Sequence, residues 1–471
     1  MIKTPAEADR VLVAKFGEAG QGQVFDFWGR LGPPERRALL GQLHALDLPL
    51  LRKLTARYLR GSQEVLESRV LTPPPRIEVG GGEGGAREAR EAGEAALRAG
   101  RVAVLTAAGE PREEGGFDRP RGVLPIGPVS GKSLFRHHAE RIRALARRYR
   151  TAIPWIIATS PGDHADTMAH FQGSNHFGLS RTEVTFLTQD ELPVVNRRGK
   201  ILLAAADRVA TSPNGHGGVL LKLLAHQDLL HSLEARGVEH VFYFQVDNPM
   251  VKIADSEFLG HHIRKGCDMS SKSVRRIEPD EPVGIFCQFN GTLGVVEHRE
   301  LGASDRARRT PDGGLEFWAG NIGVHIFTLE FLRRLRTEKV ELPYHSVERA
   351  TPHLDRRGNR VTPGKPGCIH FECSIFDALP LARAPLVVET ERSEEFSPVK
   401  RPAGGESPET ARRDLSRLYA RWLEAAGAEL ETPRGADPGP IEISPLYALD
   451  AEELKEKLEA PTRVGAGFFL Q

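Results

Sequence analysis

An aspartate follows directly on an apolar run near the middle of the chain. Residues 240–246 have the sequence His-Val-Phe-Tyr-Phe-Gln-Val, and Asp247, Asn248 and Pro249 come next. A carboxylate at the tip of a central strand of an α/β sheet is well placed to hold Mg²⁺ against phosphate groups, because hard cations prefer carboxylate oxygens. Asn-Pro is also a turn signal, so Asp247 could equally cap the next turn. The local sequence leaves both interpretations open.

Two glycine-rich segments could approach phosphates. The loop 107–131 follows a short apolar run, and a long loop of Gly and Pro between a strand and a helix offers backbone N–H groups to anions. It ends in Gly-Lys-Ser at 131–133, but Ile126 stands where a P-loop needs its first glycine. The segment 212–218 has three glycines in four residues, which permits a tight turn and close approach of a ligand. Either segment could equally be an ordinary entry into a helix.

Composition excludes several classes of protein. Lys and Arg total 64 against 63 Asp and Glu, and a net charge of +1 predicts neither nucleic acid nor an anionic membrane as a partner. Four cysteines in 471 residues, without a C-x-x-C pair, form no disulfide framework and predict reduced thiols. No apolar run approaches the ~18 residues of a membrane span. The histidines lack zinc-site spacing, and no G-x-S-x-G occurs. We therefore expect a cytoplasmic protein.

Short apolar runs alternate with amphipathic segments from about residue 100 onward. This alternation indicates a mostly parallel sheet with helices on both faces. Ligands of such sheets bind beyond the carboxyl ends of the strands, so the loops after Leu105, Ala158 and Val246 are the first candidates for a site. The predicted strands are 102–105, 155–159 and 240–246, and the predicted helices between them are 133–148 and 220–236.

Changes in composition predict three domains. Helical spacing over residues 5–70, followed by a Pro/Gly-rich stretch at 72–85, predicts an N-terminal helical region with a linker over 1–99. The alternating strands and helices predict an α/β domain over 100–401. A polar stretch rich in Gly, Pro and Glu then precedes a small C-terminal domain over 402–471.

Many short segments, kept in order along the chain, resemble those of the UDP-sugar pyrophosphorylase family (UDPGP type 1). Within it the chain is most similar to the UDP-N-acetylglucosamine pyrophosphorylases, because of the forms Gly320-Asn321-Ile322 and Phe-Ser-Pro-Val-Lys at 396–400. The segments that carry the resemblance include 117–122, 130–135, 213–218, 245–255, 271–274, 317–322 and 395–400.

The resemblance implies a Rossmann-like, GT-A-like nucleotidyltransferase fold, with a mixed, mostly parallel sheet, an N-terminal helical region and a small C-terminal domain. It implies a uridylyltransferase that joins UTP and a sugar 1-phosphate, N-acetylglucosamine 1-phosphate being favoured, into a UDP-sugar and pyrophosphate. Mg²⁺ is the implied cofactor, since both reactants are highly anionic. UTP, the sugar 1-phosphate and the UDP-sugar are the implied partners.

Positions that match the family's motifs inherit roles from the resemblance. Lys400 and Arg121 are the implied catalytic residues, and Asp247 is the implied metal ligand. The implied nucleotide-binding residues are Gly109, Gly116, Gln189, Gly217, Gly218 and Asp247, and the implied sugar-binding residues are Asn248, Glu297, Gly320 and Asn321.

One loop departs from the family pattern. The family's phosphate loop has the form G-G-x-G-T-R-L-G, whereas residues 109–116 are Gly-Glu-Pro-Arg-Glu-Glu-Gly-Gly, so Glu113 replaces the threonine and Glu114 the catalytic arginine. Reversing one charge ~4 Å from a phosphate changes the sign of an interaction of about 4 kcal/mol at an effective dielectric near 20. The alternative function is therefore a catalytically weak homologue that binds a nucleotide-sugar as a sensor or scaffold.

Overall fold

The computed structural model describes residues 7–60, 71–75, 85–109, 116–298, 300–432, 436–459 and 462–471. Contacts between residues divide the chain into two compact units. Unit 1 comprises Met1–Val65, Gln189–Leu220 and Leu342–Ile375, and unit 2 comprises Leu66–Thr188, Leu221–Glu341 and Phe376–Gln471. The division into domains at 99/100 and 401/402 stays a prediction.

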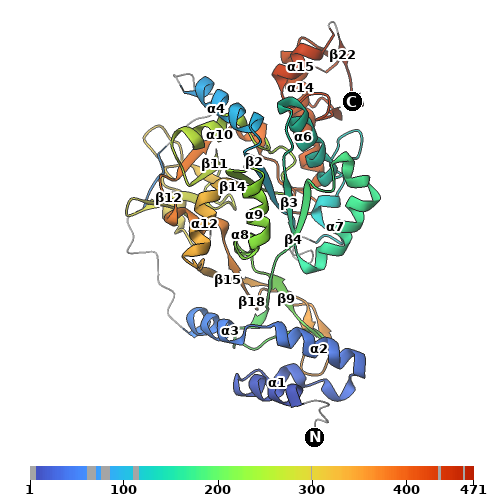
Figure 1. The fold of residues 1–471 in the computed structure, drawn as a ribbon, viewed down its shortest axis with the longest axis vertical. Coiled ribbons are helices and arrows are strands. Elements are labelled where there is room, and N and C mark those ends of the chain that lie inside the picture. Colours follow the sequence, from blue (N-terminus) through green and yellow to red (C-terminus); the bar gives the residue numbers. More distant parts are fainter. Residues whose placement is uncertain are drawn as a thin grey trace. The chain divides into compact units, whose positions relative to one another are not determined.

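Among the described residues, ten strands of unit 2 form one mixed sheet (Figure 1). One block is parallel, in the order β10 (His240–Gln245), β2 (Val102–Ala107), β3 (Trp155–Thr159) and β4 (Val184–Thr188). The remaining strands are β14 (Ala319–Thr328), β11 (Met269–Arg275), β12 (Ile285–Phe289), β13 (Thr292–Val296), β1 (Leu71–Thr72) and β19 (Leu386–Glu389). The α/β class with a mixed sheet is confirmed, but β14 and most strands beyond it pair antiparallel.

The strands of the parallel block are buried on both faces. Val104, Trp155 and Phe242 point into one apolar cluster, and because strand side chains alternate, their neighbours Leu105, Ile156 and Tyr243 are buried on the opposite face. This explains the continuous apolar runs from which the strands were predicted. The helices of unit 2 that contribute to the cluster are α4 (Ala86–Arg98), α6 (Leu134–Tyr149), α7 (Pro161–Gly173) and α10 (Ser256–Arg264).

The C-terminal part of unit 2 packs on the loops that precede α6 and follow β10. Its long helix α14 (Pro408–Ala425) begins with a capping box, in which Ser407 Oγ accepts a hydrogen bond from Thr410 N and Thr410 Oγ1 accepts one from Ser407 N. The apolar face of α14 joins Met250 and Val399 in a second core cluster. The smaller elements of this region are β20 (Glu429–Leu430), β21 (Ile441–Ile443), α15 (Ala451–Lys457), β22 (Arg463–Val464) and β23 (Phe468–Leu470).

Unit 1 combines the N-terminal helices with two later segments of the chain. The helices are α1 (Glu7–Glu18), α2 (Pro33–Ala45) and α3 (Leu48–Thr55), in agreement with the predicted helical region. Their apolar side chains share a core with residues of β6 (Val195–Asn196), β7 (Leu203–Ala205), β8 (Arg208–Val209) and β18 (Cys368–Cys373). Gln21 joins the parts by hydrogen bonds, since its Nε2 donates to Gly199 O at 2.8 Å and its Oε1 accepts from Ile201 N at 2.9 Å.

The cysteines and the helices bear on the predicted environment of the chain. The four cysteines are buried and free of disulfide bonds. Within the described ranges, no helix combines the length and apolar character that crossing a membrane requires. The cytoplasmic location stays a prediction.

Helices α4 and α10 cross in unusually close contact. A Cβ atom on Gly93 would lie 1.8 Å from Ser256 O, and one on Gly260 would lie 1.6 Å from Ala89 O. Only glycine permits this approach of two helix backbones. The crossing anchors α4 on the helix that follows the 247–251 loop.

We expect Gly93→Ala to lower the free energy of unfolding of the protein by about 1–3 kcal/mol, because the added methyl group forces α4 away from α10. Urea denaturation followed by circular dichroism measures the change. Gly173→Ala, at the end of α7, is the matched control, since nothing lies within 4 Å of its added Cβ. Equal unfolding midpoints for the two variants would contradict the proposed role of the crossing.

Candidate functional site

Three loops meet at the carboxyl edge of the parallel block. Val246 N donates a hydrogen bond to Ala107 O at 2.9 Å, which joins the end of β10 to the end of β2. Gly109 lies two residues beyond β2, and a Cβ on it would lie 2.2 Å from Ser160 N, the residue that caps α7. The structure therefore brings the loops after β2, β3 and β10 together, as the sequence predicts, and glycine at 109 is required by close backbone contact.

The carboxylate of Asp247 is buried at this edge. Its exposed fraction is 2%, its Oδ2 has no hydrogen-bond partner among the described residues, and that oxygen lies 3.8 Å from Arg121 NH1. Burial raises the pKa of Asp247, although Arg121 and Lys400 act to lower it. Burial likewise lowers the pKa of Arg121, against the attraction of Asp247 and Asp163. A buried carboxylate oxygen without a partner is costly, so a cation close to it would stabilise the site.

Asp247 fits the role of a magnesium ligand. Mg²⁺ is commonly held by one or two carboxylates together with substrate phosphates, and the free Oδ2 supplies one such ligand. In the part of the chain that the structure describes, no group of three or more His, Cys, Asp or Glu side chains could hold a metal ion. A magnesium ion at Asp247 would therefore depend on oxygen atoms of a bound ligand or of water.

Lys400 reaches the same edge from a different part of unit 2. Val399 N donates to Asp247 O at 2.9 Å, which ties the 395–400 segment to the 247–251 loop. Lys400 Nζ lies 3.7 Å from Glu406 Oε1, and Lys400 N donates to Glu406 O. The side chain of Lys400 is one-third exposed, so its pairing with Glu406 leaves it accessible to an anion. The structure thus brings together Asp247, Arg121 and Lys400, which lie far apart in the sequence.

Asn248 acts as a brace between two segments. Its Nδ2 donates to Glu395 O at 2.7 Å, and its Oδ1 accepts from Ser397 N and Met250 N, each at 3.2 Å. Its amide is therefore engaged in holding the 395–400 segment. The implied contact of Asn248 with a sugar stays a prediction.

Three side chains of α6 form hydrogen bonds to backbone carbonyl groups of residues 246–251. Nε2 of His138 lies 2.9 Å from Val246 O, Nε2 of His137 lies 3.1 Å from Pro249 O, and Arg141 donates to Val251 O. Burial lowers the pKa of His138 to about 3 and that of His137 well below its usual value, so both rings are neutral near pH 7 and each donates an N–H. Sequence reasoning missed them, because two adjacent histidines carry no recognisable pattern.

A buried ionic cluster supports the start of the 395–400 segment. Lys272 Nζ lies 2.5 Å from Asp255 Oδ2 and 2.6 Å from Glu395 Oε2, and Thr390 Oγ1 donates to Glu395 Oε1 at 2.6 Å. Despite burial, the two carboxylates raise the pKa of Lys272, and Lys272 lowers that of Asp255, so the cluster stays charged. Charges removed from water in this way are tolerated only when they are fully paired.

The implied sugar-binding residues Gly320, Asn321 and Glu297 lie in the antiparallel part of the sheet. Ile285 of β12 pairs with both Gly320 and Val296, and Glu297 follows Val296 directly. Asn321 Oδ1 accepts from Gly323 N at 2.9 Å, and a Cβ on Gly323 would lie 3.0 Å from Cδ of Gln245. Gly320 and Asn321 therefore lie on β14, the strand beside β10, whereas Glu297 follows β13, which β12 separates from β14.

The implied nucleotide-binding residues Gln189, Gly217 and Gly218 belong to unit 1. A Cβ on Gly218 would lie 1.7 Å from Asn214 Oδ1, and one on Gly217 would lie 2.7 Å from the carbonyl carbon of Cys373. Both glycines are thus required by local packing, which was the alternative interpretation of this segment. A role for these three residues in binding a nucleotide stays a prediction.

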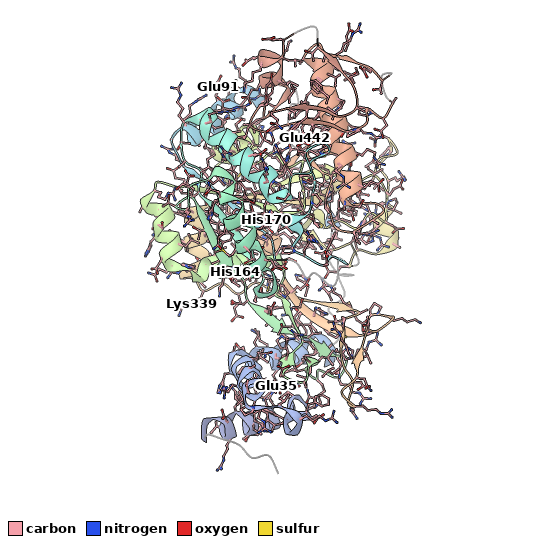
Figure 2. The ribbon with its side chains drawn as sticks, turned by 90° about the vertical axis from the view of Figure 1, so that its right-hand side faces the viewer. Glu35, Glu91, His164, His170, Lys339 and Glu442 are labelled. Atoms are coloured by element: carbon pink, nitrogen blue, oxygen red, sulfur yellow. The ribbon has the colours of Figure 1, made fainter. Side chains whose placement is uncertain are left out.

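The segment before α6 holds a carboxylate of the chain itself. Val129 N and Ser130 N donate to Glu442 Oε2 at 2.9 and 2.7 Å, and Ser130 Oγ donates to its Oε1. Glu442 is labelled in Figure 2. Lys132 pairs with Glu140 at 2.6 Å. The segment that ends in Gly-Lys-Ser therefore joins the start of α6 to the C-terminal part of unit 2. Of the loop itself, Gly116 lies against Pro402, whereas residues 110–115 are outside the described residues.

Comparison with known proteins identifies the family. A family model described as UTP–glucose-1-phosphate uridylyltransferase matches residues 51–403. The chain is 35% identical to UDP-N-acetylhexosamine pyrophosphorylase-like protein 1 of Homo sapiens, over 95% of this chain and 94% of that protein. It is 31% identical to UDP-N-acetylglucosamine pyrophosphorylase of Saccharomyces cerevisiae, over 94% of this chain and 95% of that protein.

The fold is also found in a solved relative. The structure of the uridine diphosphate N-acetylglucosamine pyrophosphorylase from Trypanosoma brucei superposes with a TM-score of 0.79 at 24% identity, covering 100% of this chain and 99% of that chain. The two proteins therefore share the same fold over their whole length. Taken with the family model, which spans most of the chain, it leads to one conclusion: the chain belongs to the UTP–glucose-1-phosphate uridylyltransferase family.

Proposed function

We propose that this protein is a uridylyltransferase that joins UTP and a sugar 1-phosphate into a UDP-sugar and pyrophosphate. The observation that carries the proposal is the buried carboxylate of Asp247, whose Oδ2 lies 3.8 Å from Arg121 NH1. The backbone carbonyl of Asp247 also accepts a hydrogen bond from Val399 N, next to Lys400. N-acetylglucosamine 1-phosphate is the favoured acceptor, supported by the Gly320-Asn321-Ile322 form and by the 31% identity to the yeast UDP-N-acetylglucosamine pyrophosphorylase.

The proposed reaction is a nucleotidyl transfer. An oxygen of the sugar phosphate forms a bond to the α-phosphorus of UTP, the bond from that phosphorus to the bridging oxygen breaks, and pyrophosphate leaves with the electron pair. Mg²⁺, when bound, would neutralise phosphate charge. Asp247 would provide a protein ligand for it. Arg121 and Lys400 would orient the phosphates and stabilise the charge that develops on the leaving group, Lys400 exchanging Glu406 for a phosphate oxygen.

A second candidate function rests on the altered loop. Glu113 and Glu114 occupy the positions of the family's threonine and arginine, next to the triphosphate in the family arrangement. Losing an arginine that stabilises phosphoryl transition-state charge can cost roughly 10³-fold or more in rate. A homologue that binds a nucleotide-sugar without rapid turnover, as a sensor or scaffold, is therefore the alternative.

One assay separates the two functions. The protein is incubated with UTP, Mg²⁺ and N-acetylglucosamine 1-phosphate, and the release of pyrophosphate is followed; a parallel reaction contains EDTA. Turnover that requires both substrates and Mg²⁺ supports the transferase. Binding of UDP-N-acetylglucosamine in calorimetry, without turnover, would support the binding protein. Neither turnover nor binding would contradict both.

We expect Asp247→Asn to abolish Mg²⁺-dependent turnover, because the substitution keeps the shape of the side chain but removes the charge that would hold the metal. The variant should fold, since an uncharged amide is easier to bury than an unpaired carboxylate. Pyrophosphate release and the thermal unfolding midpoint are measured together. Wild-type turnover in a well-folded Asp247→Asn protein would contradict the assignment.

We expect Lys400→Ala to weaken the binding of UTP or UDP-sugar at least ~10-fold, because a charge-assisted hydrogen bond to phosphate contributes about 1.5–3 kcal/mol. Isothermal titration calorimetry gives the dissociation constants. Lys455→Ala removes the same charge from an exposed position of α15 and is the matched control. Equal affinities for the two variants would exclude a phosphate contact of Lys400.

The altered loop yields a gain-of-function prediction. Replacing residues 110–114 by Gly-Gln-Gly-Thr-Arg removes three glutamates and one proline and restores N–H donors and a cation where the family has them. We expect the rate of pyrophosphate release to rise at least ~10-fold, and the affinity for UTP to rise more than that for an uncharged sugar. A wild-type chain that is already fast, and that this replacement slows, would show that another residue has taken the role of the family arginine.

A further inference from the structure

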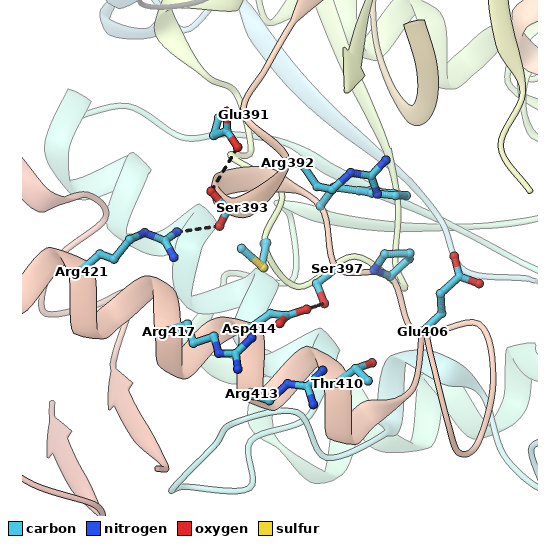
Figure 3. Close-up of a pocket in the computed structure, with 13 residues that line it drawn as sticks. Glu391, Arg392, Ser393, Ser397, Glu406, Thr410, Arg413, Asp414, Arg417 and Arg421 are labelled. Carbon is cyan, nitrogen blue, oxygen red and sulfur yellow. Dashed lines mark hydrogen bonds between the residues drawn. The ribbon is translucent and has the colours of Figure 1, made fainter. Parts of the chain in front are cut away.

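A pocket of about 570 Å³ lies in unit 2 behind the segment that carries Lys400 (Figure 3). One wall is the face of α14 that carries Thr410 to Arg421, and the other is the segment 391–398; Met250 also lines the pocket. Asp247, Arg121 and Lys400 do not line it, although Glu406, the partner of Lys400, does, so the pocket adjoins the proposed reaction site. Its volume falls within the range of ordinary small-molecule sites.

Arginines dominate the charged lining of the pocket. Arg413, Arg417 and Arg421 follow one another at intervals of four residues on α14, so they share one face of the helix at a spacing of about 6 Å. Arg392 belongs to the other wall (Figure 3), where it pairs with Glu281. The pocket therefore offers guanidinium groups from two sides.

Two of these arginines have no partner among the residues that the structure describes. Arg421 pairs with Glu394 at 2.9 Å, and Arg392 pairs with Glu281. Within the described residues, by contrast, neither Arg413 nor Arg417 forms a hydrogen bond or an ion pair. Like charges at i and i+4 on a helix repel each other. A bound anion would relieve that repulsion.

The acidic residues of the lining do not neutralise Arg413 and Arg417. Asp414 Oδ2 accepts a hydrogen bond from Ser397 Oγ at 2.7 Å, and Glu391 accepts one from Ser393 Oγ at 3.3 Å (Figure 3). Glu406 pairs with Lys400. Each carboxylate therefore has a partner of its own, while Arg413 and Arg417 remain available to a ligand.

We propose that this pocket binds a small anion that carries two or more phosphoryl groups. Guanidinium groups recognise phosphate oxygens through paired N–H donors, and they do so better than lysine ammonium groups. The spacing of Arg413 and Arg417 suits an extended oligophosphate, whose neighbouring phosphoryl groups can each meet one arginine. A single phosphate can reach fewer of these donors and binds more weakly.

Titration calorimetry of the full chain tests this proposal, at fixed ionic strength and with EDTA present to remove metal ions. The probes are inorganic tripolyphosphate, inorganic phosphate and glucose 6-phosphate. We expect tripolyphosphate to bind most tightly, and Arg413→Gln/Arg417→Gln to weaken its binding at least ~10-fold. Arg413→Gln alone should give an intermediate loss. Because both arginines are exposed and unpaired, the variants should keep the wild-type circular dichroism spectrum and unfolding midpoint.

Two control proteins make the outcome decisive. Arg87→Gln/Arg463→Gln removes the same charge from exposed positions outside the pocket and should change the affinity by less than ~2-fold. Lys400→Ala reports binding at the proposed reaction site instead. The proposal is overturned if no probe binds the wild-type chain, if both double variants lose the same affinity, or if only Lys400→Ala weakens binding. None of these measurements requires turnover, so they remain independent of the proposed function.

Discussion

The site is organised around a charge that the protein keeps out of water. Asp247 is almost completely buried, yet within the described part of the chain one of its carboxylate oxygens has no hydrogen-bond partner and lies 3.8 Å from Arg121. Folding alone would favour a neutral or fully bonded group at this position. An arrangement of this kind is stabilised only when cations surround it, which Arg121 and Lys400 do in part. The remaining deficit supports the proposal that this edge of the sheet binds a metal–phosphate complex.

Holding such a carboxylate in place requires a rigid surrounding. His137, His138 and Arg141 bond to three carbonyl groups of the loop around Asp247, and Asn248 ties that loop to the segment 395–397. The buried cluster of Lys272, Asp255 and Glu395 secures that segment in turn. Two neutral histidines are suited to this task because they donate hydrogen bonds without adding charge beside Asp247. Together with the bond from Val399 N to Asp247 O, these contacts couple the loop to the segment that carries Lys400.

The sequence predicts the parts of this structure that depend on local pattern. The strands β2, β3 and β10 follow from buried apolar runs, Asp247 from its place at a strand tip, and the family from motifs kept in order. The supports of the site could not be predicted in this way, since His138 and Val246 are 108 residues apart and Ser130 and Glu442 are 312 apart. For Gly217 and Gly218, by contrast, the sequence motif does not distinguish binding from packing. Contact with Cys373 and Asn214 requires glycine at these positions whether or not a nucleotide binds. The partners of the N-terminal helices in unit 1 were likewise beyond any local signal.

The bond between Glu442 and the turn at 129–130 has a consequence for the synthesis of the protein. The turn lies directly before α6, the helix whose histidines carry the loop around Asp247, but its carboxylate is contributed 312 residues later in the chain. At roughly 5–20 residues per second, a ribosome needs about 15–60 seconds to cover that interval. During this time the N–H groups of Val129 and Ser130 lack the carboxylate of Glu442 as a hydrogen-bond acceptor. The turn before α6 therefore gains this acceptor only after residue 442 has been made, and a nascent chain that stalls before Glu442 lacks one of the contacts that hold the start of the helix below Asp247.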